Sequence, residues 1–208
     1  MHFVFIRFSI VAIAFGTISF AQSADLSSAQ PAGPSLAQPA PSIATSPMTG
    51  GERVHWLAHQ NLSPLALLED VAIGGEETWV NSPKEYGPHW QGFGERVGMT
   101  AANYGVKTTM EAGLGSIWGE DPRYDRTEGE KFPARLGHVV KMTFMARNRE
   151  GNTMPAYARF LAIPGSSFLA NTWMPDSQAT VSDAAVRTGL GFLSRMGENA
   201  FKEFRPRH

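Results

Sequence analysis

The longest helical pattern in the chain runs from Trp90 to Tyr124. Its apolar residues recur at steps of three and four, which is the spacing of one helix face rather than the alternation of a strand. The pattern predicts one helix, or two helices end to end, that stop at Asp121-Pro122 because proline pushes the preceding residue out of the helical region. Lys107 and Glu111 lie one turn apart and are predicted to pair weakly on an exposed face. The apolar positions are Met99, Ala102, Val106, Met110, Leu114 and Ile117.

Glycine recurs throughout this stretch. Each glycine in a helix interior costs about 1 kcal/mol against alanine, so a run of glycines needs a compensating contact. Small residues at four-residue spacing let a second helix approach closely, which makes this stretch the predicted packing centre. The alternative is that the glycines are loop breaks between short helices. The glycines are Gly92, Gly94, Gly98, Gly105, Gly113 and Gly115, and the predicted packing stripe is Ala101, Gly105, Thr109 and Gly113.

Two further helices have clear end signals. Ser63-Pro64 places a serine cap before a proline in the first helical position, and Gly74-Gly75 can close that helix. The last helix is predicted to begin at Thr180 or Ser182 and to stop at Pro206. Its apolar face comprises Val181, Ala185, Gly189, Leu193, Met196, Ala200 and Phe204.

The region from residue 133 to residue 174 allows two interpretations. One is a helix over residues 133–144, followed by an apolar run over Tyr157–Met174 that is interrupted at Pro164. The other is a hairpin, because residues 139–146 and 156–163 could pair across the turn between them. We favour helices. The predicted fold is therefore an all-α, compact bundle of about five helices with glycine- and alanine-lined packing faces.

Composition removes several classes of function. The 208 residues include 18 lysines and arginines against 19 aspartates and glutamates, so the chain lacks the basic excess that nucleic-acid binding needs. It contains no cysteine, which excludes disulfides, thiol catalysis and thiolate metal sites. His55 and His59 share a helix face, but they lack the HExxH pattern and a third ligand. We predict no metal site and no cofactor.

The start of the chain has the features of an exported protein. Residues 1–21 combine a weakly basic start, an apolar core and a small-residue cleavage site, and are predicted to be a signal peptide. Residues 22–50 are rich in Ala, Ser, Pro and Gln and are predicted to form a disordered linker. Residues 51–208 are then the helical domain. The predicted location is the periplasm or the outer membrane of a bacterium, since an export signal without cysteine suits that compartment.

The densest polar cluster follows the central stretch. Carboxylates beside arginine and tyrosine could perform acid–base chemistry or bind a polar ligand. They could equally form a structural clasp at the proline turn, with Asp121 binding backbone amides and Arg123 covering helix carbonyls, and this is the interpretation we favour. The candidate residues are Glu120, Asp121, Arg123, Tyr124 and Arg126.

Two segments of the chain resemble a known family. Trp90-x-Gly92-Phe93-Gly94-Glu95-Arg96-Val97-Gly98, followed by a small-residue helix and Asp121-Pro122-Arg123-Tyr124, is similar to a family of uncharacterised exported bacterial proteins. Members of that family tend to show W-x-x-G-Y-x-K-R-x-G and His/Gln-Asp-Pro-Arg-Tyr. This chain has Phe93, Glu95 and Glu120 where the family has tyrosine, a basic residue and His or Gln, and these differences argue against Glu120 as a shared catalytic group. The resemblance implies export and assigns no functional residue.

Two hypotheses of function remain. The first is a non-enzymatic structural or interaction module of the bacterial envelope, with peripheral membrane contact, contact with another envelope protein or self-association. The second is a small periplasmic hydrolase or ligand-binding domain that uses the cluster Glu120–Arg126.

Overall fold

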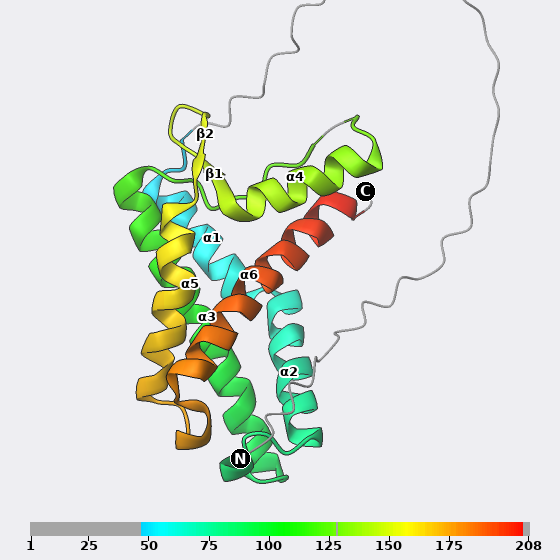
Figure 1. Ribbon diagram of the computed structural model, residues 1–208, viewed down its shortest axis with the longest axis vertical. Coiled ribbons are helices and arrows are strands. Elements are labelled where there is room, and N and C mark those ends of the chain that lie inside the picture. Colours follow the sequence, from blue (N-terminus) through cyan, green and yellow to red (C-terminus); the bar gives the residue numbers. More distant parts are fainter. Residues whose placement is uncertain (1–46, 128, 206–208) are drawn as a thin grey trace, which may run out of the picture. The chain divides into compact units, whose positions relative to one another are not determined.

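The computed structural model describes residues 47–127 and 129–205, which belong to one compact unit (Figure 1). The predicted signal peptide and most of the predicted linker lie outside the described residues. The all-α bundle is confirmed, and the single short hairpin lies between two of its helices. The elements are α1 Gly50–Leu62, α2 Pro64–Trp79, η1 Lys84–Tyr86, α3 Trp90–Trp118, α4 Phe132–Phe144, β1 Met145–Arg147, β2 Thr153–Pro155, α5 Tyr157–Leu169, η2 Ala170–Thr172, η3 Asp176–Gln178 and α6 Val181–Phe204.

Side-chain caps fix the starts of three helices. Thr49 and Glu52 form a capping box at the start of α1, so the folded unit includes the last two residues of the predicted linker. Ser63 caps α2 as predicted, by accepting a hydrogen bond from the Ala66 amide. Thr180 caps α6, in a box with Asp183.

Helix α2 does not stop at Gly74-Gly75, as we predicted, but continues to Trp79. The reason is a close helix contact. A Cβ placed on Gly74 would lie only 2.5 Å from Cγ2 of Val97 on α3, so glycine is required here for packing rather than for ending the helix.

Helix α3 is one unbroken helix, which makes the loop-break interpretation of its glycines wrong. It ends earlier than predicted, at Trp118, because Gly119 adopts a left-handed conformation with φ 71° and its amide bonds back to the carbonyl of Gly115. In Figure 1, α3 lies behind α6 and beside α5. It also packs against α1 and α2.

The predicted packing stripe on α3 is not where other helices approach most closely. Thr109 and Gly113 are exposed, and a Cβ on Gly113 would meet no heavy atom of the described residues within 4 Å. Ala101 and Gly105 are half-buried, and the nearest contact of a Cβ on Gly105 would be 3.5 Å from the side chain of Asn61. The closest approach instead occurs at Gly92, near the start of α3.

The region of residues 139–163 contains both structures that we considered. Residues 139–144 complete α4, and the apolar run after residue 156 is α5, so most of the region is helical. A hairpin of three residues per strand joins them, with Ala146 opposite Met154. Pro164 lies inside α5 rather than interrupting it. In the part of the chain that the structure describes, no helix combines the length and hydropathy that crossing a membrane requires.

The interior of the unit is unusually polar. Its buried apolar residues are mostly alanines, such as Ala112, Ala146, Ala158 and Ala162, which let the helix backbones lie close together. Most of the large apolar side chains are at least partly exposed. By contrast, the largest fully buried side chains are Arg96, Glu120, Glu203, Val139, Asn199, Thr108 and Thr143.

Arg96 on α3 organises the connection between α2 and α3. Its side chain is fully buried and donates hydrogen bonds to the carbonyls of Ser82, Pro83 and Gly87, at 3.0, 2.6 and 2.8 Å. Three carbonyls therefore replace the water that a guanidinium would otherwise bind. The arginine of the segment Trp90–Gly98 thus has a structural role.

Glu77 lies near Arg96 and provides a test by pH. Burial raises the pKa of its carboxyl to about 7, against the opposing effect of Arg96. The folded chain therefore holds this proton more tightly than the unfolded chain, whose glutamates titrate near ~4.3, and the associated stability is lost as the pH rises from ~4.3 to about 7. We expect Glu77→Gln to raise the free energy of unfolding by about 1–3 kcal/mol at pH 8 and to change it little at pH 4.

Urea unfolding at both pH values measures this difference. Glu130→Gln is the matched control, because Glu130 is exposed. An equal change in the free energy of unfolding at pH 4 and pH 8 for Glu77→Gln would show that proton binding is not responsible.

Candidate functional site: a polar clasp and an apolar face

The candidate cluster begins with Glu120, which caps the start of α5. Helix α5 has Ala156 at its N-cap position and no side-chain cap of its own. Glu120 is 1% exposed, and its Oε2 accepts a hydrogen bond of 2.9 Å from the amide of Ala158 in the first turn of α5. A carboxyl at a helix N-terminus satisfies an amide that lacks an intrahelical partner. Burial raises the pKa of Glu120, so this carboxyl holds a proton more readily than an exposed one.

Asp121 and Arg123 connect the turn to β1 and α1. The Asp121 carboxylate accepts hydrogen bonds from the amide of Arg123 and from its guanidinium, at 2.9 and 2.6 Å. The Asp121 amide donates to the carbonyl of Arg147, at 2.9 Å. Arg123 also lies 3.7 Å from the carboxylate of Glu52 on α1. Asp121 therefore binds a backbone amide as predicted, and Arg123 pairs with the carboxylates of Asp121 and Glu52.

Tyr124 and Arg126 both bind Glu203, near the end of α6. The Tyr124 hydroxyl donates to Oε2 of Glu203 at 3.1 Å, and the Arg126 guanidinium donates to the Glu203 carbonyl at 2.8 Å. Glu203 is fully buried, and its Oε1 also accepts a hydrogen bond of 2.8 Å from Arg135 on α4. Burial by itself raises the pKa of Glu203, but hydrogen bonds from Arg135, Thr127 and Tyr124 outweigh it and hold that pKa below its usual value.

The five candidate residues thus bind four different parts of the fold. Their partners lie on α5, on β1, on α1 and on α6, as the contacts above show. We refer to this set of contacts as the clasp. Such contacts are what a structural role requires, and acid–base chemistry at Glu120 would additionally need access for a substrate to a side chain that is 1% exposed.

A second ionic group, which the sequence interpretation missed, lies at the centre of the bundle. Glu111 of α3 is 2% exposed, so it does not pair with Lys107 on an exposed face as predicted. Its Oε1 accepts hydrogen bonds from Arg159 of α5 at 3.1 Å and from Arg195 of α6 at 3.2 Å. One carboxylate therefore joins three helices.

The two arginines also donate to backbone carbonyls, and Arg195 donates in addition to Oε2 of Glu198 at 3.3 Å. Arg159 donates to the carbonyls of Met142 and Thr143, each at 2.9 Å, and Arg195 donates to the carbonyl of Pro122 at 2.7 Å. Burial by itself raises the pKa of Glu111, but Arg195 and Arg159 outweigh it and keep that pKa below its usual value. Burial lowers the pKa of Arg159 to about 10, so this group remains charged at neutral pH.

One signal in the sequence could have located this centre. Arg159 is the sole charged residue of α5, and Arg195 and Glu198 are the only charges between Thr188 and Phe201 on α6. An isolated charge within a long uncharged segment is a candidate for a buried ion pair. Helix sides that face water usually carry several charged residues, whereas a buried side carries a charge only where a partner binds it.

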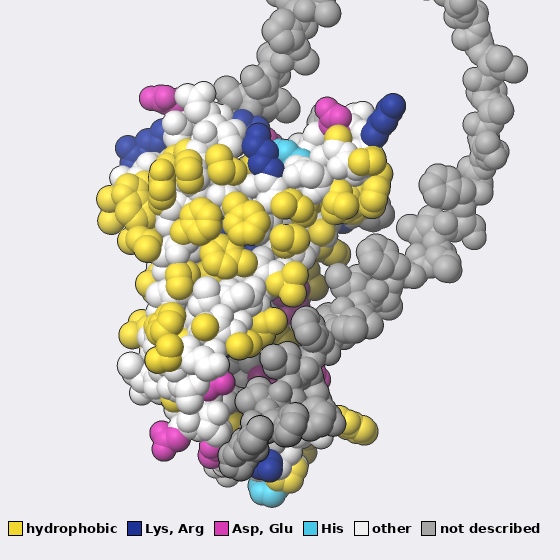
Figure 2. All heavy atoms as spheres, viewed as in Figure 1, with side chains coloured by type: hydrophobic (Ala, Val, Ile, Leu, Met, Phe, Trp, Pro, Cys, Tyr) yellow, Lys and Arg dark blue, Asp and Glu magenta, His cyan; other side chains and the backbone are white. Residues whose placement is uncertain are grey.

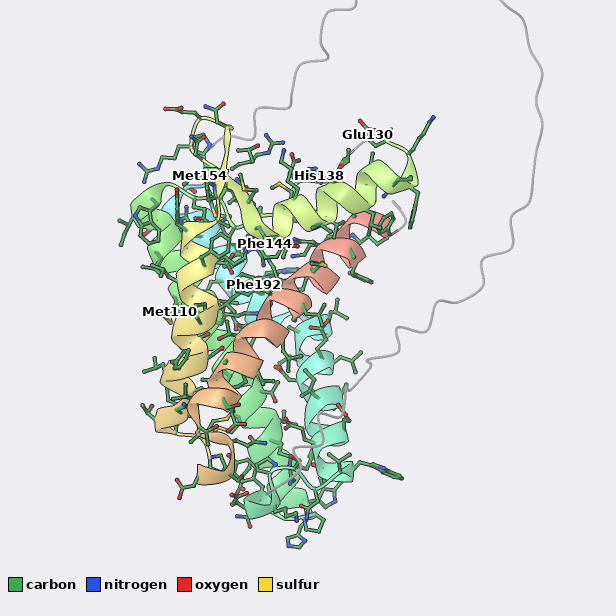
Figure 3. The ribbon with its side chains drawn as sticks, viewed as in Figure 1. Met110, Glu130, His138, Phe144, Met154 and Phe192 are labelled. Atoms are coloured by element: carbon green, nitrogen blue, oxygen red, sulfur yellow. The ribbon has the colours of Figure 1, made fainter. Side chains whose placement is uncertain are left out.

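Pairing of the charges inside the bundle leaves an extensive apolar surface outside. Figure 2 shows hydrophobic side chains gathered over α4, α5 and α6 on one side of the unit. At the centre of this surface, the centroid of the Phe192 ring lies 5.8 Å from that of Phe144 and 5.7 Å from that of Phe160. Figure 3 labels Phe192 and Phe144. We define the apolar face as this aromatic group together with eight further exposed apolar residues of the same three helices. The full set is Leu136, Val140, Phe144, Tyr157, Phe160, Leu161, Val186, Leu190, Phe192, Leu193 and Phe201.

The apolar face is larger than the surface of a free monomer normally allows. Phe144 and Phe160 are each 38% exposed, and Leu193 is 57% exposed. If each exposed member leaves roughly 80 Å² in contact with water, about half of a large side chain, the face amounts to roughly 800 Å². The largest apolar patch of a typical monomer is about 300–600 Å², and larger patches mark interaction sites.

Comparison with protein-family models, with curated proteins and with solved structures finds no match to this chain.

Proposed function

We propose that this chain is a non-enzymatic interaction module of a bacterial envelope and that it attaches to its partner through the apolar face. The observation that carries the proposal is the combination of a roughly 800 Å² apolar surface with an interior in which Glu111 pairs with both Arg159 and Arg195. A domain without a binding partner usually has its charged residues on the surface and its large apolar side chains in the core.

Two features of the sequence support the cellular location in this proposal. Residues 1–21 have the pattern of an export signal, and the resemblance over the segments Trp90–Gly98 and Asp121–Tyr124 points to exported bacterial proteins. The module would therefore act in the periplasm or at the outer membrane.

The second candidate function is a hydrolase or ligand-binding domain that uses the cluster Glu120–Arg126. The buried Glu120 carboxyl with its raised pKa favours this function, since such groups are common in active sites. We prefer the interaction module because Tyr124 and Arg126 bind α6, and Asp121 binds Arg123 and β1, which leaves these groups committed to the fold.

Cell fractionation tests the proposed function. We expect the full chain to be recovered with the envelope or in a complex rather than as a free monomer. The variant Leu161→Gln/Leu190→Gln should instead be released, with affinity reduced about tenfold or more, because two large apolar side chains each worth about 1.5–3 kcal/mol no longer leave water. Both residues are about half exposed, so the fold should survive, and circular dichroism verifies this.

The matched control is Val54→Gln/Ile117→Gln. These residues are 68% and 73% exposed but lie on α1 and on α3, outside the apolar face. We expect this variant to fractionate like the original chain. Release of both variants to the same extent, or recovery of the unchanged chain as a free monomer, would contradict the proposal.

A further inference from the structure

The outer side of α6 carries a regular seam of exposed residues. Val186, Leu190, Leu193 and Phe201 are 50%, 54%, 57% and 50% exposed, and they follow one another at steps of four, three and eight. The step of eight is divided by Gly197, which is also exposed. This spacing places all five residues on one side of the helix. We call these residues, together with Gly189 and Ala200, the α6 seam.

The two glycines of the seam, Gly189 and Gly197, are not required by any close contact within the described unit. A Cβ on Gly189 or on Gly197 would meet no heavy atom of the described residues within 4 Å. Alanine at either position would be the better helix former. Gly191 differs from them, because a Cβ there would lie 2.7 Å from Ile163 of α5. Space is therefore open at two exposed positions where none of the described residues occupies it.

The seam is complementary to itself in the antiparallel direction. If a second α6 is laid against the first and centred on residue 195, Leu193 faces Gly197 of the other copy, and Gly197 faces its Leu193. In the same register, Phe201 faces Gly189, and Leu190 faces Ala200. Leu190, Leu193 and Phe201 are thus each opposite a small residue, which is the arrangement in which helix backbones approach closely, and Val186 lies opposite Phe204 at the ends of the pair. In a parallel pair in register, Leu193 would face Leu193 and Gly197 would face Gly197.

We propose that the partner of the apolar face is a second copy of this chain, with the two α6 helices antiparallel across a two-fold axis near residue 195. This inference rests on the proposed function and specifies its partner. A two-fold interface uses the same surface on both copies, as the seam requires. The apolar face supplies roughly 800 Å² per copy, which is the area of a stable standard-size interface. Figure 1 shows α6 between α4 and α5 on the viewed side, so two copies could meet through all three helices.

An exchange of residues tests the register. Sedimentation of the full chain gives the dissociation constant of the dimer. Gly197→Leu should raise that constant by about 100-fold because it fills the space for Leu193, and Leu193→Gly should raise it similarly because it removes the bulky partner. The double variant Leu193→Gly/Gly197→Leu exchanges the two sides of the pair, and it should return the constant to within about tenfold of the original.

The two single variants also separate dimerisation from folding. Gly197→Leu replaces glycine in a helix and should stabilise the monomer, whereas Leu193→Gly should destabilise it, yet both should weaken the dimer. The control is Gly113→Leu, at an exposed glycine of α3 whose Cβ position is equally open. We expect this control to leave the dissociation constant unchanged.

Failure of this inference can be distinguished from failure of the proposed function. Vesicles of phosphatidylethanolamine and phosphatidylglycerol provide the second measurement. A chain that remains monomeric but binds these vesicles, and loses that binding in Leu161→Gln/Leu190→Gln, would overturn the dimer and keep the apolar face as an attachment site. A dimer that the exchanged double variant fails to restore would overturn the antiparallel register. A monomer that binds neither vesicles nor the envelope would contradict both proposals.

Discussion

Glu111→Gln is expected to lower the free energy of unfolding by about 3–5 kcal/mol, the cost of leaving buried charges without their partner. Arg159 and Arg195 both direct a guanidinium at the Glu111 carboxylate, at 3.1 and 3.2 Å, and are 3% and 4% exposed. Glutamine keeps the volume of the side chain but removes the charge that both arginines share. Arg195 keeps its 3.3 Å pair with Glu198, whereas Arg159 loses its ion pair and keeps its hydrogen bonds to backbone carbonyls. Urea unfolding at pH 7 measures the loss.

The control for this prediction is Glu95→Gln. Glu95 lies on the same helix but is exposed, with a hydrogen bond to Gln91 at 3.0 Å. Its replacement should change the free energy of unfolding by less than about 0.5 kcal/mol. A loss below about 1 kcal/mol for Glu111→Gln would mean that water or rearrangement compensates the arginines, and the ionic centre would not hold the three helices together.

Gly92→Ala is expected to have the second large effect, a loss of at least about 3 kcal/mol in the free energy of unfolding. A Cβ at this position would lie 2.5 Å from the carbonyl oxygen of Gly87 and closer still to that of Tyr86. Both obstacles are backbone, and the Gly87 carbonyl also accepts the 2.8 Å hydrogen bond from Arg96. The connection cannot move away without breaking contacts of the buried arginine.

Gly94→Ala is the matched comparison, two residues further along α3. A Cβ there would meet no heavy atom of the described residues within 4 Å. This substitution should raise the free energy of unfolding by about 0.5–1 kcal/mol, since alanine is the better helix former. Thermal or urea unfolding of the two variants gives the contrast, and equal effects of the same sign would show that Gly92 is not held against the connection.

The sequence was sufficient to predict where several helices begin. The sequence predicts Ser63 as the cap of α2 and either Thr180 or Ser182 as the cap of α6, because serine and threonine side chains bind free amides of the first turn. The structure has the hydrogen bonds of Ser63 and Thr180. These predictions depend only on residues within one turn of each other. The end of α3 was less predictable, because glycine at position 119 and proline at position 122 are both stop signals, and the chain uses the first.

The sequence did not reveal which side of each helix faces inward. The apolar side of a helix is expected to pack inward, yet Val181 and Leu193 of α6 are 71% and 57% exposed, and Leu65 and Leu68 of α2 are 49% and 63% exposed. The usual rule assumes that water covers the outside of a domain and that apolar residues therefore face the core. That assumption identifies the wrong side of a helix as the buried side where charged residues pair in the interior, as Glu111 does with Arg159 and Arg195.

The candidate cluster shows the same limit at the level of single residues. The density of charge around Asp121 and Arg123 indicated that these side chains act together, and they do bind each other. Their more distant partners could not be inferred, because Tyr124 binds Glu203, 79 positions later in the chain. No local pattern connects residues that far apart.

The central claim is that the apolar face is covered when the protein is in place, and thiol accessibility in cells tests it most directly. The chain contains no cysteine, so Leu190→Cys on the face and Val54→Cys outside it each introduce a single thiol. A maleimide reagent should label both thiols rapidly in dilute purified protein, because the two residues are 54% and 68% exposed. In permeabilised cells that produce the full chain, we predict that the thiol at position 54 is labelled rapidly and that the thiol at position 190 is protected. Equal labelling of the two thiols in cells would contradict the claim.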